Sequence, residues 1–84
     1  MHRNYCGILG SVIKDIRKEK KLSQEVLSGL AGISRSHLAL IENGKKSANI
    51  RTLWSIADAL KIPLSSLIQT AEKQLDALEG ENAF

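Results

Sequence analysis

Two short helical patterns, joined by a short turn that contains one glycine, leave this chain few ways to fold. The first pattern covers residues 24–30 after a capping Ser23, and the second covers residues 35–42 after a capping Ser34. A serine before a helix accepts a hydrogen bond from an unpaired backbone N–H of the first turn. Gly32 between the patterns can adopt the left-handed conformation that ends a helix, because it has no Cβ. The segment therefore predicts two helices that meet at a tight corner.

The apolar residues of this segment fall on the sides of the two helices that face each other. Leu27 and Ala31 share one face of the first helix, and Leu38 and Ile41 share one face of the second. Residues three or four apart lie on the same side of a helix. Ile33 lies at the corner and can fill the space between the helices. This pattern is typical of a helix-turn-helix, whose second helix projects from the body of the protein.

Three further stretches keep apolar residues at helical spacing. They cover residues 8–20, 50–60 and 63 to about 78. Asn49 is a capping residue before the second of these stretches, and Gly80 is expected to end the third. The chain contains one proline and one residue each of Trp, Tyr and Phe, a composition that favours helices over β-sheet.

The predicted fold class is all-α, a compact cluster of five helices. A length of 84 residues gives room for one domain over residues 1–84, with its core within residues 8–69 and a frayed end at residues 81–84. Apolar runs are shorter than the roughly 20 residues that cross a membrane. We expect a cytoplasmic protein, because the single cysteine, Cys6, cannot form an intramolecular disulfide. We expect no cofactor or metal, because Cys6 and the two histidines lack metal-ligand spacing. Since no catalytic constellation is apparent, we do not expect an enzyme.

Charge is distributed unevenly along the chain. Residues 1–51 hold ten Lys or Arg and four Asp or Glu, a balance of +6, whereas residues 52–84 hold two and five, a balance of −3. A basic half suits a protein that presents one face to a polyanion such as DNA. The asymmetry alone is a weak indication, because many proteins have basic faces.

The order and spacing of many residues together form a specific pattern over about residues 9–68. These residues are Leu9-Gly10, Ile13, Arg17, Leu22-Ser23-Gln24-Glu25, Leu27, Ala31-Gly32-Ile33-Ser34-Arg35-Ser36, Leu38, Ile41-Glu42-Asn43-Gly44-Lys45, Thr52-Leu53, Ile56-Ala57 and Ala59-Leu60. The pattern resembles the lambda-repressor-like (Cro and Xre type) helix-turn-helix family. In size and layout the chain is most similar to the restriction–modification controller proteins of that family.

The resemblance implies a transcriptional regulator that binds double-stranded DNA sequence-specifically, as a homodimer on a pseudo-palindromic operator. A restriction–modification controller protein is one candidate. An antitoxin, a phage Cro-like repressor, or a protein-interaction (coactivator) module with the same fold are the alternatives. A pure interaction module would not need the polar face of the second motif helix or the two lysines that follow it.

Four residues of the second motif helix are candidates for reading bases. With Leu38 and Ile41 facing inward, Ser36 and Leu40 face outward. Arg35 and Ser34 lie at the N-terminal end, which enters the major groove in this motif. The planar fork of an arginine can bond guanine O6 and N7 together, and a leucine can contact a thymine methyl. Packing of Leu40 on a neighbouring residue is the competing interpretation.

Other polar residues are expected to contact DNA phosphates. The resemblance assigns this role to Gln24, at the start of the first motif helix. The remaining candidates follow or flank the second motif helix, or come from the first helix: Arg17, His37, Asn43, Lys45, Lys46, Ser47 and Asn49. Basic side chains beside the reading helix supply the sequence-independent part of the affinity. A solvated surface loop is the alternative for the lysines, and simple exposure is the alternative for His37.

Two further predictions concern structure and assembly. The resemblance implies an ion pair between Arg17 and Glu42 that orients the second motif helix. The last helix has an apolar stripe that extends beyond what a four-helix body can bury, so it predicts a dimer interface. The interface residues are Leu67, Ala71, Leu75, Leu78 and Trp54. In the alternative, this helix folds back on its own domain and Trp54 borders the core.

Overall fold

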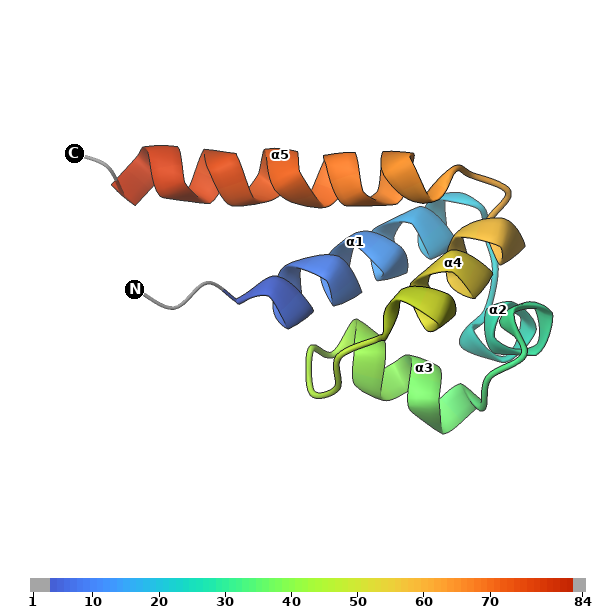
Figure 1. Cartoon of the computed structure of the whole chain (residues 1–84). Helices are drawn as coiled ribbons and strands as arrows, with labels where there is room; N and C mark the ends of the chain where they lie inside the picture. The colour runs from blue at the N-terminus through green and yellow to red at the C-terminus, as the bar shows by residue number, and fades with distance from the viewer. Residues whose placement is uncertain (1–3, 83–84) are drawn as a thin grey trace.

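The chain forms five helices joined by short connections. The computed structural model describes the backbone of residues 4–82 and the side chains of residues 4–79. The helices are α1 (Tyr5–Glu19), α2 (Gln24–Ala31), α3 (Arg35–Glu42), α4 (Ile50–Ala59) and α5 (Leu64–Asn82) (Figure 1). The described residues contain no strand, so the predicted all-α cluster of five helices is confirmed.

Side-chain caps set where the helices begin. Ser23, Ser34 and Asn49 each accept a hydrogen bond from a backbone N–H of the following first turn, at 2.8–3.0 Å, as predicted. Asn4 caps α1 in the same way, because its side chain accepts from the N–H of Gly7 at 2.9 Å. This cap was not predicted from the sequence. It explains why α1 begins at Tyr5 rather than three residues later.

Residues of two types, glycine and lysine, adopt a left-handed conformation after the helices. Gly32 and Gly44 adopt the left-handed conformation with φ of +73°, the role expected of glycine after a helix. Lys21 and Lys61 take the same conformation after α1 and α4, with φ of +59°, although their Cβ atoms disfavour it.

The expected end of the last helix at Gly80 is wrong. Gly80 is helical, and α5 continues through residue 81 to Asn82. A glycine permits a left-handed end but does not impose one, and the residues on both sides of this glycine are compatible with a helix. The predicted frayed end thus begins within the helix at residues 81 and 82, while residues 83–84 lie outside the described part of the chain.

The core lies where the helices meet, with α1 and α4 between α5 on one side of the molecule and α3 on the other (Figure 1). Its buried side chains come from all five helices and from Leu60, the residue directly after α4. They are Val12, Ile13, Leu27, Ala31, Leu38, Ile41, Leu53, Ile56, Leu60, Leu67 and Ala71. Gly10 allows α1 to approach the end of α3, because a Cβ at this position would overlap the carbonyl oxygen of Ile41. The position of α3 is thus fixed by close backbone contact.

Candidate DNA-binding surface

Helix α3 has one buried side and one exposed side. Leu38 and Ile41 are buried in the core, whereas Arg35, Ser36 and Leu40 are exposed. Leu40 keeps 41% of its surface accessible, so part of its side chain remains available to a DNA base. The structure therefore brings the predicted base-reading residues together on one exposed face.

Two further candidate residues, Ser34 and His37, lie at the N-terminal end of α3. Ser34 is exposed, and its hydroxyl accepts the hydrogen bond from the backbone N–H of His37. The hydroxyl can still donate, because an O–H group carries a donor besides its lone pairs. His37 is half-buried, whereas Arg35 and Ser36 are exposed. The first turn of α3 therefore presents Arg35 as its exposed cation.

A basic loop follows α3 directly. Asn43, Lys45, Lys46 and Ser47 are all exposed, and Asn49 is exposed at the start of α4. The backbone N–H groups of Lys45 and Lys46 both donate to the carbonyl oxygen of Leu40, at 2.9 and 3.3 Å. The loop backbone is therefore anchored to α3 while its cationic side chains point to solvent.

A second contact anchors this loop to α1. The hydroxyl Oγ of Ser47 lies 2.8 Å from the Sγ of Cys6, a contact that was not predicted from the sequence. A Cβ at Gly44 would lie 2.8 Å from the Cα of Gly7, so the loop backbone also approaches α1 closely. Contacts between residues about 40 positions apart leave no local signal in the sequence. They hold the lysine-bearing loop at one position beside α3.

A buried polar network fixes the C-terminal end of α3. The Nε of Arg17 donates to Oε2 of Glu42 at 2.7 Å, and a terminal guanidinium nitrogen donates to Oε1 at 3.0 Å. The other terminal nitrogen donates to the carbonyl oxygen of Leu22 at 2.8 Å. The hydrogen bonds to Glu42 raise the pKa of Arg17 above its usual value, although burial alone would lower it. The predicted ion pair is present and is bidentate.

Two predicted phosphate contacts take part in this network. Arg17 is only 8% exposed, and each of its three nitrogen atoms donates a hydrogen bond inside the protein. The structure therefore assigns Arg17 to the ion pair and does not support its predicted contact with phosphate. Gln24 is half-buried, and its Nε2 donates to Oε1 of Glu42 at 3.0 Å. Its backbone N–H still lies at the N-terminus of α2, where anions are favoured.

The residues predicted for the dimer interface differ in exposure. Leu67 and Ala71 are buried in the core of the protomer and offer almost no surface to a second copy, so they belong to the chain's own core. Leu75 is half-buried, while Leu78 and Trp54 are 49% and 56% exposed. The first turns of α5 thus cover the protein's own core, and the exposed apolar surface lies farther along α5 and on α4.

The family of the chain follows from comparison with known proteins. A family model described as helix-turn-helix matches residues 13–67, which include α2, α3 and the corner between them. The chain belongs to this helix-turn-helix family. The resemblance stated from the sequence is thereby confirmed. Membership also agrees with the prediction that the chain is a DNA-binding protein and not an enzyme.

Two relatives of the chain come from Bacillus phage phi105. The chain is 43% identical to an immunity repressor protein over 60 residues, which are 71% of this chain and 42% of the repressor. It is 42% identical to an ImmF control region 10 kDa protein over 62 residues, covering 74% of this chain and 69% of that protein. The chain thus spans less than half the length of the immunity repressor.

A solved structure with the same fold is the restriction–modification controller protein C.AhdI from Aeromonas hydrophila. It aligns with a TM-score of 0.72 and 31% identity, over 74% of this chain and 94% of the controller protein. The chain therefore shares its fold with a restriction–modification controller protein, as the sequence indicated. Among the described helices of this chain, none is long and apolar enough to span a membrane.

Proposed function

We propose that this chain is a transcriptional regulator that binds double-stranded DNA sequence-specifically, as a homodimer on a pseudo-palindromic operator. The observation that carries the proposal is the exposed face of α3, which places Arg35, Ser36 and Leu40 together beside the basic loop of Lys45 and Lys46. An α-helix fits the major groove of B-DNA, where each base pair presents a distinct set of donors and acceptors. In this proposal the chain acts in the cytoplasm of a bacterium.

The two groups of residues have different tasks. Arg35 reads a guanine through its planar fork, and Leu40 gives a thymine methyl an apolar partner. Lys45 and Lys46 contact phosphates and supply affinity that does not depend on sequence. The buried pair of Arg17 and Glu42 keeps α3 at a fixed angle to the body, so that the reading residues need little ordering when DNA binds.

Two symmetric copies are needed because one α3 reads only a few base pairs. A dimer with a two-fold axis presents two reading helices to two inverted half-sites, whose centres lie about 10 base pairs or a small multiple apart. The exposed apolar side chains of Trp54 and Leu78 support an interface with a second copy.

Two kinds of regulator are favoured by specific observations. The relative with 43% identity is a phage immunity repressor, which supports a repressor of phage genes. The controller protein C.AhdI is covered over 94% of its length, which supports a restriction–modification controller. Antitoxins and coactivator modules share the fold, but the exposed cations around α3 favour DNA over a protein as the partner of this face.

Selection of bound duplexes from a random pool tests the proposal. We expect the selected sequences to share two inverted half-sites with the spacing given above. Footprinting of the selected duplex should protect both half-sites on one side of the DNA. Recovery of unrelated sequences with equal affinity would contradict the proposal and favour the protein-interaction module.

A further inference from the structure

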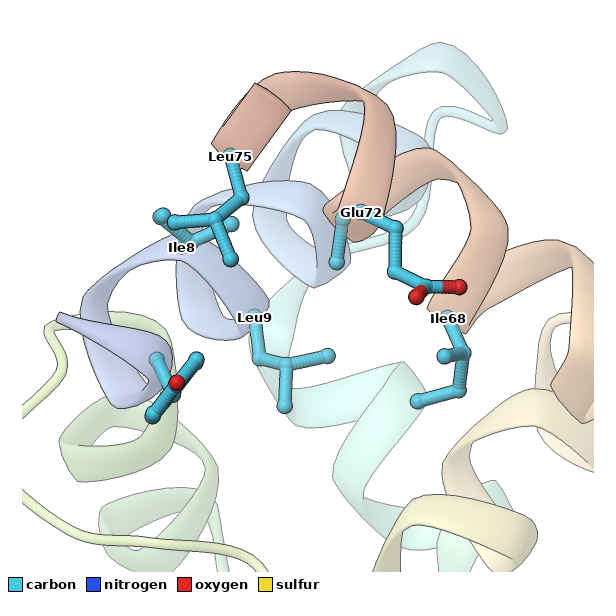
Figure 2. A pocket seen from close by; sticks show the side chains of 7 residues that line it. Ile8, Leu9, Ile68, Glu72 and Leu75 are labelled. Carbon is cyan, nitrogen blue, oxygen red and sulfur yellow. The ribbon is translucent and has the colours of Figure 1, made fainter. Parts of the chain in front are cut away.

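An apolar groove of about 190 Å³ lies between α1 and α5 (Figure 2). The residues that line it are apolar or aromatic apart from one carboxylate: Tyr5, Ile8, Leu9, Ile68, Ala71, Glu72 and Leu75. Figure 2 shows Leu75 of α5 against Ile8 of α1, with Leu9 and Ile68 below them. Sites for small molecules usually enclose about 300–1,000 Å³. The groove is thus smaller than a typical ligand site and has the size to accept one large side chain.

The chain carries an exposed side chain of that kind directly beside the groove. Trp54 on α4 is 56% exposed and lines a second, open groove together with Pro63, Leu64 and Ser65. Ile68 and Glu72 line both grooves, so the two grooves are neighbours that meet at these residues. Tryptophan is enriched at the centres of protein interfaces, where it fills pockets on the partner.

We propose that the α1–α5 groove accepts Trp54 from a second copy of this chain, and that the two copies exchange this contact. The inference rests on the homodimer proposed above and names the residues that hold it. In a two-fold dimer, if residue i contacts residue j of the partner, then j also contacts i. An axis that passes beside Ile68 and Glu72, between the two grooves, places each Trp54 over the groove of the other copy.

Charge and hydrogen bonding favour this arrangement. An indole N–H needs an acceptor when it is buried, and the carboxylate of Glu72 lies at the groove. Arg51 is exposed one turn before Trp54 on the same side of α4, so it would arrive near Glu72 together with the indole. Asp58 lies one turn beyond Trp54, on the end of α4 away from Arg51. The exchanged contact therefore joins an apolar anchor to a pair of opposite charges, and Arg51 offsets the repulsion between the two Glu72 carboxylates that the axis brings together.

The arrangement is compatible with the binding of two half-sites. α5 and α3 lie on opposite sides of the molecule (Figure 1). A two-fold axis that runs in the direction from α5 to α3 keeps both copies of α3 at the same end of the dimer. Both exposed faces of α3 can then address one DNA duplex.

The emission of the single tryptophan tests the proposal directly. In the dimer the indole of Trp54 should be shielded from water, so its fluorescence should be blue-shifted and protected from acrylamide. On dilution the emission should move to the red over the same concentrations at which analytical ultracentrifugation shows dissociation into monomers. A dimer whose tryptophan emits like an exposed indole would overturn this inference and leave the homodimer in place. A chain that stays monomeric at all concentrations and on DNA would overturn both.

Substitutions separate the anchor from general effects of apolar surface. Trp54→Ala should weaken the dimer about 30-fold or more, as expected for a central interface anchor. Leu30→Ala, at an exposed leucine on α2, is the matched control and should leave the dimer unchanged. Circular dichroism should show intact helices in both variants, because both side chains are exposed. Equal dimer affinity in the two variants would overturn the inference.

A charge swap tests the predicted pairing of the copies. Arg51→Glu and Glu72→Lys should each weaken the dimer several-fold, because each places like charges at the groove. The double variant should recover most of the lost affinity, since it restores opposite charges between the copies. Additive losses in the double variant would mean that these residues do not meet, and the proposed register of the two copies would be wrong.

Discussion

Arg17→Met removes the guanidinium that pairs with the carboxylate of Glu42, whose side chain is 0% exposed. The substitution deletes two hydrogen bonds to that carboxylate and a third to the carbonyl oxygen of Leu22. The hydrogen bond from Gln24 remains but brings no positive charge. A buried charge that loses its partner typically costs about 3–5 kcal/mol of unfolding free energy. A chain of this length has a total of about 4–13 kcal/mol, so the variant should be close to unfolding.

The same reasoning predicts a milder effect when both charges are removed. Arg17→Met combined with Glu42→Leu leaves no stranded carboxylate, so the double variant should regain at least about 2 kcal/mol relative to Arg17→Met. Urea denaturation followed by circular dichroism measures both values. Lys18→Met is the control, because Lys18 is exposed on the same helix and should change stability by less than about 0.5 kcal/mol. If Arg17→Met costs no more than Lys18→Met, the network does not stabilise the fold as argued.

Three further substitutions test the packing, the cap and the assembly. Gly10→Ala should lower stability by about 1–3 kcal/mol because its Cβ overlaps the carbonyl oxygen of Ile41, whereas Gly29→Ala should raise it by about 0.5–1 kcal/mol because nothing lies within 4 Å. If the melting temperatures of both variants shift in the same direction, the packing argument for Gly10 is wrong. Ser34→Ala should cost about 1 kcal/mol through loss of the α3 cap, and an unchanged melting curve would count against it. Leu78→Asp should weaken the dimer in ultracentrifugation while circular dichroism stays helical, and an unfolded variant would instead place Leu78 in a core.

Features that depend on local chemistry could be predicted from the sequence. Ser23, Ser34 and Asn49 cap their helices as expected, because a capping side chain needs only a backbone N–H three residues away. Helical spacing also identified Leu38 and Ile41 as the buried side of α3. The exposed face of α3 follows from that assignment.

Features that depend on distant contacts or on backbone conformation were missed. The contact of Gln24 with Glu42 joins residues 18 positions apart, and nothing near Gln24 in the sequence signals it. Lys21 adopts a left-handed conformation that its side chain disfavours, so residue type gives the wrong expectation there. Gly80 shows the reverse, since a residue that permits a helix end lies within a helix. The burial of Ala71 depends on how far along α5 the contact with the body extends, which spacing alone does not determine.

The most direct test of the account compares Arg35→Ala with Lys46→Ala on DNA, across single-base variants of the operator and a range of salt concentrations. Arg35→Ala should lose about 1–3 kcal/mol on the operator and its preference at one base pair of each half-site. Lys46→Ala should weaken binding to all duplexes by a similar factor and reduce the salt slope by about one for each half-site. If both variants lose affinity evenly across all sequences, α3 does not read bases through Arg35 and the account is wrong.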